Sequence, residues 1–121
     1  EAVVIGWNRS ASSASAISAA LPLLEMSRSV TIVTVTTGAK QGPSPQEIAR
    51  YLSWHEVQAE VVEIPPDHRL VGEVLLEEAE RVSADLLVMG AYSHSRLREL
   101  ILGGVTRHVL QNADLPVLMA H

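Results

Sequence analysis

Short apolar runs and longer amphipathic stretches alternate along the chain. The runs are rich in Val, Ile and Leu, and polar, Gly or Pro residues bound them. Such runs predict buried β-strands. We expect five strands, at residues 2–7, 30–36, 57–64, 85–90 and 115–120. Because most of these runs do not alternate between apolar and polar positions, they are typical of a parallel sheet that is covered on both faces.

Helical patterns fill the segments between the strands. We expect helices at residues 10–27, 44–55, 69–84 and 105–113. The alternation of strand and helix predicts an α/β fold, a five-stranded parallel sheet with helices on both faces, because parallel strands need crossover connections. A length of 121 residues is typical of one domain.

Single residues sharpen several boundaries. Ser44 before Pro45, with Glu47 three residues after the cap, predicts a well-capped start to the second helix. Pro22 falls inside the first helical pattern, so we expect it to kink that helix or to end its regular hydrogen bonding. Pro116, at the start of the last strand, favours an edge position in the sheet.

Composition narrows the class of protein. The absence of Cys excludes disulfides and thiolate metal sites, and it fits a reducing compartment such as the cytoplasm. The net charge of −5 argues against non-specific nucleic-acid binding. No apolar run approaches the length that spans a bilayer. Because Phe is absent and aromatic residues make up only 3%, the predicted core is aliphatic.

No catalytic or metal-binding pattern stands out in the sequence. The five histidines are scattered without the spacing of metal ligands. The serines include no G-x-S-x-G nucleophile motif. We therefore expect no metal site in the protein itself and assign no catalytic base or nucleophile.

The sheet predicts where a ligand binds. In open parallel sheets, ligands bind beyond the carboxyl ends of the strands, where the strand order reverses. The loops after the first, second and fourth strands are the candidates. Residues 7–10 read WNRS, and residues 90–106 read GAYSHSRLRELILGGVT. If the first and fourth strands are neighbours, these two loops face each other across one crevice.

The longer loop has the features of a phosphate-binding segment. Gly90 permits a sharp turn where the strand ends. Gly103-Gly104 interrupts the helical pattern, because a helical glycine costs roughly 1 kcal/mol relative to alanine. A new helix can begin near Val105 and Thr106, with its free amide groups and positive dipole end facing the crevice. The alternative is that the glycines serve only packing and turn geometry.

On these residues the sequence resembles the universal stress protein family. Nucleotide-binding members of that family carry G-x2-G-x9-G-(S/T) after the fourth strand, and residues 90–104 keep this spacing. The resemblance runs over nearly the whole chain. Residues 90–106 are most similar to the second domain of tandem members. Residues 1–121 are thus expected to form a single universal-stress-type domain, either complete or part of a longer tandem chain.

The resemblance implies a fold, a ligand and a partner. The fold is the Rossmann-like adenine nucleotide alpha hydrolase-like fold, with strand order 3-2-1-4-5. The ligand is ATP or a related adenine nucleotide, with Mg²⁺ only as its companion, and the adenosine is expected near the loops after strands one and two. Members often pair through the last strand, so we expect a homodimer or pairing with a sister domain. The implied function is a stress-response or regulatory module; the alternative is a dimerisation or interaction module without nucleotide.

The family's nucleotide-binding positions carry over one by one. Asn8 stands at the place of an aspartate after the first strand, and Val35 matches the residue whose backbone meets the base. Trp7 either lines the base pocket or belongs to the core. The full set of expected nucleotide-binding residues is Trp7, Asn8, Val35, Met89, Gly90, Ser93, Gly103, Gly104, Val105 and Thr106.

Three positions depart from the family pattern. Asn8 removes a charge but keeps a hydrogen-bonding side chain, which can also serve to cap the first helix. Ser93 replaces the second glycine, and if this position needs a positive φ the replacement costs roughly 1–2 kcal/mol, or about tenfold in affinity. Gly104 replaces Ser or Thr and removes a hydroxyl, which Thr106 can supply nearby.

Overall fold

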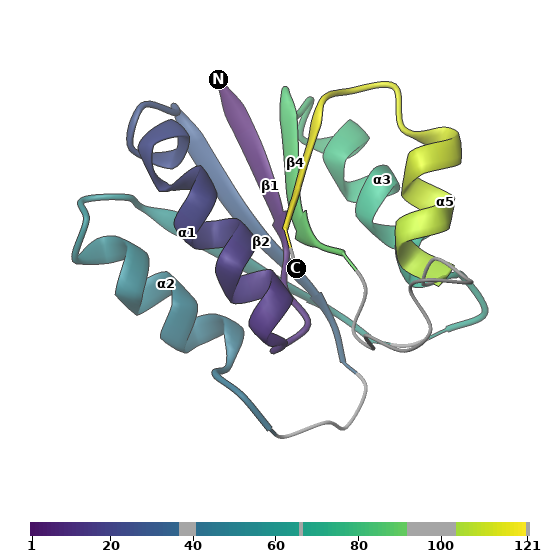
Figure 1. Ribbon diagram of the computed structural model, residues 1–121, viewed down its shortest axis with the longest axis horizontal. Coiled ribbons are helices and arrows are strands. Elements are labelled where there is room, and N and C mark those ends of the chain that lie inside the picture. The colour runs from purple at the N-terminus through teal and green to yellow at the C-terminus, as the bar shows by residue number, and fades with distance from the viewer. Residues whose placement is uncertain (37–40, 66, 92–103, 121) are drawn as a thin grey trace.

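Strands and helices alternate through the residues that the structure describes (Figure 1). The computed structural model describes residues 1–36, 41–65, 67–91 and 104–120. The elements are β1 (Ala2–Gly6), α1 (Ala11–Glu25), β2 (Ser29–Val35), α2 (Pro45–Ser53), β3 (Ala59–Ile64), α3 (Val71–Arg81), β4 (Leu86–Gly90), α5 (Gly104–Asn112) and β5 (Val117–Ala120). Every predicted strand and helix is present, with ends that differ by a few residues.

The five strands form one parallel sheet in the order β3-β2-β1-β4-β5. This order confirms both the α/β class and the strand order that the family resemblance implied. β1 is central: Ile5 pairs with Ile32 of β2 on one side and with Val88 of β4 on the other. β5 lies at an edge of the sheet, as Pro116 before it predicts.

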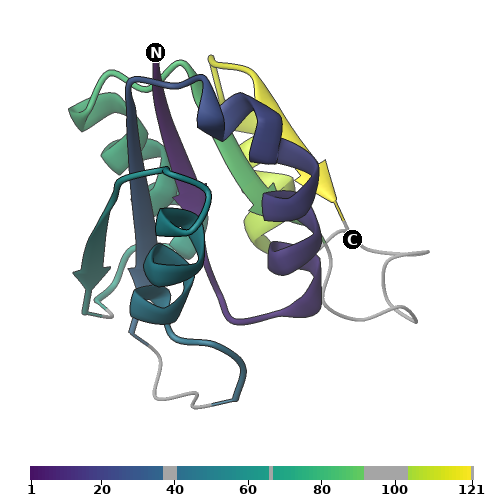
Figure 2. The same ribbon diagram turned by 90° about the vertical axis from the view of Figure 1, so that its left-hand side faces the viewer.

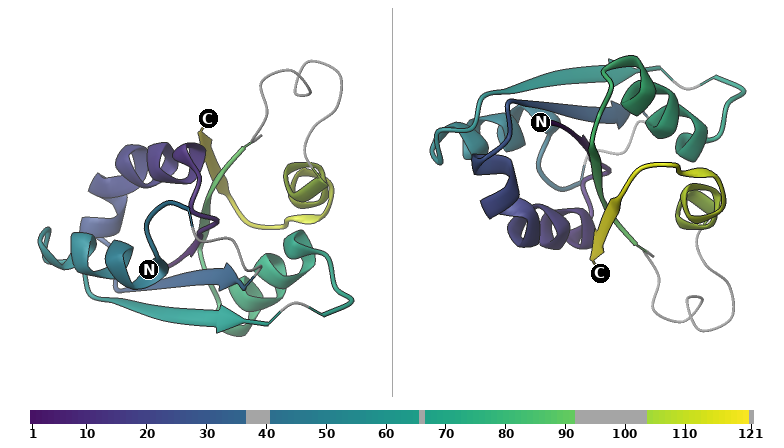
Figure 3. Two further views of the ribbon diagram at one scale, coloured as in Figure 1. Left: turned by 90° about the horizontal axis from the view of Figure 1, so that it is seen from below. Right: turned by 90° about the horizontal axis from the view of Figure 1, so that it is seen from above.

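Helices cover both faces of the sheet. α1 and α2 lie on one face, which is toward the viewer in Figure 2, and α3 and α5 lie on the other (Figures 1 and 3). Two apolar cores result, one on each side of the sheet. Within the parts of the chain that the structure describes, no helix combines the length and apolarity needed to cross a bilayer.

The alternation of side chains along β1 feeds both cores. Val3 and Ile5 pack in the core under α1 and α2, whereas Val4 packs in the core under α3 and α5. All residues of β1 are buried. Both cores are aliphatic, as the composition predicts, and Trp7 is the one aromatic side chain among the buried residues of the described ranges.

The helix ends follow local sequence signals. The Ser44 hydroxyl accepts a hydrogen bond from the backbone N–H of Glu47 at 3.1 Å, and the Glu47 carboxylate accepts one from the backbone N–H of Ser44 at 2.7 Å. This reciprocal pair confirms the predicted cap of α2. Pro22 lies inside α1, which continues to Glu25, so the proline does not end the helix.

Candidate functional site

The carboxyl ends of the strands meet at one edge of the sheet, the lower edge in Figure 1, which we call the carboxyl edge. The strand order reverses between β1 and β4, which is the point where the sequence predicts that a ligand binds. α1 and α5 also begin at this edge, on opposite faces (Figure 1). The fold thereby brings together predicted site residues from three strand ends, namely Trp7, Asn8, Val35, Met89 and Gly90.

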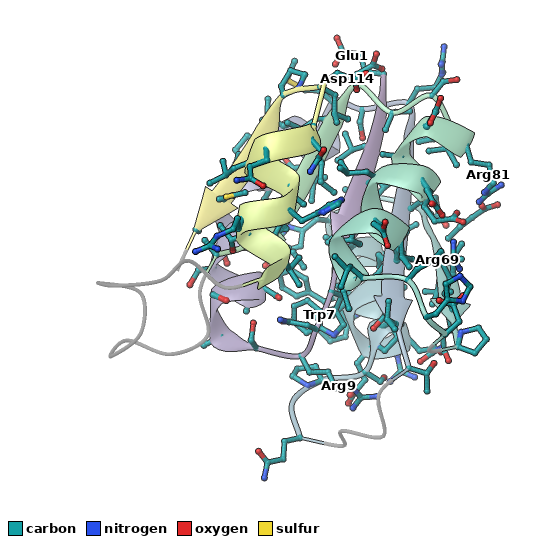
Figure 4. The ribbon with its side chains drawn as sticks, turned by 90° about the vertical axis from the view of Figure 1, so that its right-hand side faces the viewer. Glu1, Trp7, Arg9, Arg69, Arg81 and Asp114 are labelled. Carbon is teal, nitrogen blue, oxygen red and sulfur yellow. The ribbon has the colours of Figure 1, made fainter. Side chains whose placement is uncertain are left out.

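Trp7 is buried, and each of its polar atoms takes part in a hydrogen bond. Its side chain is 2% exposed and belongs to the core under α1 and α2. The indole Nε1–H donates to the carbonyl of Pro43 at 2.8 Å, and the Trp7 carbonyl accepts from the Thr34 hydroxyl at 2.8 Å. Figure 4 shows Trp7 at the low end of the sheet, close to Arg9. Its burial agrees with the predicted core role, and its position directly after β1 keeps it next to the predicted site.

The loop after β1 is tied to the loop before α2 in a second place. The Arg9 guanidinium donates from Nη1 to the carbonyl of Gly42 at 3.2 Å. Arg9 has φ +67° and Gly42 has φ +83°. A Cβ at position 42 would also collide with the Arg9 carbonyl oxygen, so glycine is required there on two grounds. No local sequence pattern predicts this contact, which joins residues 33 positions apart.

Asn8 is part of the start of α1. Its Oδ1 accepts from the backbone N–H of Ser10 at 3.1 Å, from the Ser10 hydroxyl at 2.5 Å and from the Ser13 hydroxyl. Ser10 is the N-cap, and its hydroxyl accepts from the backbone N–H of Ser13 at 3.1 Å. The N-cap of α1 is therefore Ser10 and not Asn8, whose side chain instead accepts hydrogen bonds from the cap residue.

Gly90 brings the end of β4 against the first turn of α1. A Cβ at position 90 would lie 2.7 Å from the backbone carbon of Ser12 and 2.7 Å from the backbone nitrogen of Ser13, and it would collide with the Ser12 hydroxyl. The φ of Gly90 is not positive, since Gly42 is the only glycine with a positive φ in the described ranges. The expected reason for this glycine, a sharp turn, is thus replaced by another: close packing of strand on helix.

The first turn of α5 presents Gly104, Val105 and Thr106 in three different environments. Gly104 is exposed, and a Cβ there would meet nothing within 4 Å. Val105 packs at the rim of the core under α3 and α5. Thr106 is 3% exposed, which places its side chain in the interior. Ser93 and Gly103, the remaining predicted site residues, lie outside the described residues.

The side chains of Val35 and Met89 belong to the core beneath the predicted site. Met89 is buried in the core under α3 and α5, and Val35 packs against that core. The predicted contact of Val35 with a base runs through its backbone, which stands at the carboxyl end of β2.

The charges around the carboxyl edge favour an anion. The first turns of α1 and α5 contain no acidic residue, whereas α2 and α3 carry Glu47 and Glu73 in theirs. The positive ends of the two helices that flank the crevice are therefore uncompensated. Arg9 follows β1, Arg107 lies in the first turn of α5, and neither forms an ion pair with another described residue.

Unlike Arg9 and Arg107, Arg69 forms ion pairs with other residues that the structure describes. It pairs with Asp67 at 3.0 Å and with Glu77. The side-chain hydrogen bond from Arg69 lowers the pKa of Asp67, and the same bond raises the pKa of Arg69. Because its charge is already matched by two carboxylates, Arg69 is a poor candidate for phosphate binding. In the described part of the chain, no three His, Asp or Glu side chains are arranged to hold a metal ion.

Known proteins share both the sequence and the fold. A model of the universal stress protein family matches residues 1–121. Universal stress protein Slr1230 from Synechocystis is 35% identical over 87 residues, which cover 69% of this chain but 30% of that relative. The aligned stretch therefore spans less than a third of the length of this relative.

Two solved structures show the likeness of fold. A universal stress protein in complex with cAMP has a TM-score of 0.70 at 24% identity, covering 100% of this chain and 97% of that one. The universal stress protein from Archaeoglobus fulgidus in complex with dAMP has a TM-score of 0.71 at 16% identity, covering 98% and 96%. With the family model matched from the first residue to the last, the chain belongs to the universal stress protein family.

Proposed function

We propose that this chain binds an adenine nucleotide, ATP or a close relative, at the carboxyl edge between β1 and β4. It would act as a regulatory module of the cytoplasmic stress response rather than as a catalyst. Two proteins of the same fold were solved with cAMP and dAMP. Both of those ligands pair an adenine base with a phosphate, which is the chemistry that the proposal assigns to this edge.

The observation that carries the proposal is the pair of uncompensated helix N-termini. α1 and α5 begin on either side of the β1–β4 crevice without an acidic residue in the first turn. Free backbone N–H groups and the positive dipole end of a helix together attract phosphate. Arg9 and Arg107 add positive charge at the same edge of a chain whose net charge is −5.

In the proposal, different parts of the carboxyl edge bind different parts of the nucleotide. The adenosine lies near Trp7, Asn8 and the backbone of Val35, beside Met89. The phosphates lie toward the start of α5. The proposed binding residues are those expected from the sequence, namely Trp7, Asn8, Val35, Met89, Gly90, Ser93, Gly103, Gly104, Val105 and Thr106.

Titration calorimetry with ATP, ADP, AMP and cAMP tests the proposal. We expect saturable binding of one nucleotide per chain, with an affinity that falls as salt rises, because the contacts with phosphate are electrostatic. Analysis of nucleotides released from the natively extracted protein provides an independent readout. If there is no binding heat with any of the four ligands and no nucleotide on the extracted protein, the proposal is wrong.

We further propose that β5 pairs with β5 of a second copy. β5 is an edge strand, and all of its residues are only partly buried. The carbonyls of Pro116 and Ala120 accept from Leu87 and Ala91 on the β4 side. Because backbone groups of successive residues point to opposite sides of a strand, Val117 and Met119 turn theirs to the open edge. An open edge of this kind is a template for pairing with another strand.

Replacing Met119 by proline tests the pairing. Proline removes an N–H that faces the open edge and leaves the bonds to β4 in place. We expect Met119→Pro to shift the chain from dimer to monomer, with a dissociation constant at least tenfold weaker in sedimentation equilibrium. Met119→Leu keeps the N–H and should stay dimeric. A monomeric wild type, or a dimer that survives the proline, contradicts the proposal.

A further inference from the structure

The side-chain oxygen of Asn8 has no capacity left for a ligand. Two donors from Ser10 and one from Ser13 converge on Oδ1. An amide oxygen has two lone pairs, so three donors saturate it.

The orientation of the Asn8 amide is fixed by the backbone. The N–H of Ser10 can only donate, so the atom of Asn8 that faces it must be the oxygen. The Ser10 hydroxyl accepts from the backbone N–H of Ser13 and lies closer to Oδ1, at 2.5 Å, than to the hydroxyls of Ser12 and Ser13, both at 3.0 Å. A flipped amide would set the N–H groups of Asn8 against the backbone N–H of Ser10. Nδ2 therefore points away from this cluster.

What remains of Asn8 is a pair of donors at the carboxyl edge. The residue is exposed, and in the described ranges nothing accepts a hydrogen bond from its Nδ2. The residue directly follows Trp7, at the end of β1 and beside the strand-order reversal. A ligand beside Asn8 therefore meets the N–H groups of its side chain and no acceptor from that side chain.

We propose that Asn8 is a specificity-determining residue that offers the bound nucleotide hydrogen-bond donors only. It therefore selects a ligand whose facing group on the base or ribose accepts a hydrogen bond, such as a carbonyl, a ring nitrogen, a hydroxyl or an ether oxygen, and disfavours an amino group, which only donates. This inference rests on the proposed nucleotide binding. An aspartate at this position would offer a charged acceptor instead and would select an amino or hydroxyl group.

The replacement Asn8→Asp reverses this preference without disturbing the fold. The Oδ1 of an aspartate still accepts from Ser10 and Ser13, and a carboxylate is favourable at the N-terminus of α1. Only the outward atom changes, from donor to acceptor. A thermal melt should show that the variant is at least as stable as the wild type.

The experiment measures the affinities of both proteins for ATP, for ITP and for ATP methylated on the 2′ or the 3′ oxygen. ITP exchanges the 6-amino donor of ATP for a carbonyl acceptor and turns N1 from an acceptor into a donor, and each methyl ether removes the donor of one ribose hydroxyl and leaves an oxygen that only accepts. At the position that faces Asn8, we expect the wild type to bind the analogue as tightly as ATP or more tightly. Asn8→Asp should bind the same analogue at least tenfold more weakly than ATP. Hydrogen bonds to a charged group are the stronger ones, and here the carboxylate would face a second acceptor.

Asn112→Asp is the matched control. It makes the same chemical change and adds the same charge at an exposed position, at the other end of α5. Because it also removes the hydrogen bond from Asn112 Nδ2 to the carbonyl of His108, a thermal melt should first establish that the variant is folded. Its ratios between ATP and each analogue should equal those of the wild type. If the ratios for all three analogues are the same in the wild type and Asn8→Asp, the inference about Asn8 is overturned and nucleotide binding stands. If the wild type binds none of the ligands, both are overturned.

Discussion

Gly104→Asp is expected to bind ATP roughly 30- to 100-fold more weakly than Gly104→Asn. Both side chains enter open space, because a Cβ at position 104 meets nothing within 4 Å. They have nearly the same size and differ in charge. A carboxylate about 6 Å from a phosphate charge, at an effective dielectric constant of about 20, costs roughly 2–3 kcal/mol. The first turn of α5 would then resemble those of α2 and α3, which carry glutamate.

Loss of folding cannot mimic this result. An acidic residue in the first turn of a helix stabilises it by about 0.3–1 kcal/mol, so Gly104→Asp should melt at or above the temperature of Gly104→Asn. The difference in affinity should also shrink with salt, since the screening length falls from about 10 Å at 0.1 M to about 3 Å at 1 M. Calorimetry at both salt concentrations measures it. Equal affinities at low salt would exclude phosphate contact with the start of α5.

Gly90→Ala is expected to destabilise the protein by about 1–3 kcal/mol. The added Cβ would lie 2.7 Å from backbone atoms of Ser12 and Ser13. Because backbone in the first turn of a helix cannot rotate away as a flexible side chain can, α1 must shift from β4 or the strand must bend. A loss of about 2 kcal/mol lowers the melting temperature by very roughly 8 °C in a domain of this size.

Two variants make the Gly90 experiment specific. Gly104→Ala adds the same methyl group at an open helix position and should be neutral or stabilise by up to about 1 kcal/mol. Ser12→Ala, combined with Gly90→Ala, removes the clash with the hydroxyl and leaves the two backbone clashes. The double variant should therefore recover only part of the stability. If the double variant recovers the full stability of the wild type, or if Gly90→Ala is as stable as the wild type, the backbone of α1 and β4 can move apart at little cost in free energy.

The elements were predictable because each depends on residues close together in the sequence. The strands follow from short apolar runs, and the start of α2 follows from Ser44, Pro45 and Glu47. Pro22 was harder to interpret, because the pattern alone did not decide between a kink and an end. The helix continues for three residues beyond it, to Glu25.

The sequence predicted where in the sheet the candidate site lies, but it did not predict the hydrogen bonds and packing contacts within that site. The sheet order puts Asn8 and Gly90 at one edge, as expected. The bond from Trp7 to Pro43 joins residues 36 positions apart, and no local pattern announces it. The reason for Gly90 likewise lies in α1, far away in sequence. Such contacts depend on how helices, strands and loops pack against one another. The residues next to a position in the sequence do not determine this packing.

The two ties between the loop after β1 and the loop before α2 have a consequence for the thermodynamics of association. The indole of Trp7 and the guanidinium of Arg9 hold the segment that carries Asn8 in one conformation before a ligand arrives. A segment that is already ordered loses little conformational entropy on binding. Affinity at this edge then depends on the groups that touch the ligand, and single side-chain replacements can retune it while the backbone frame stays the same.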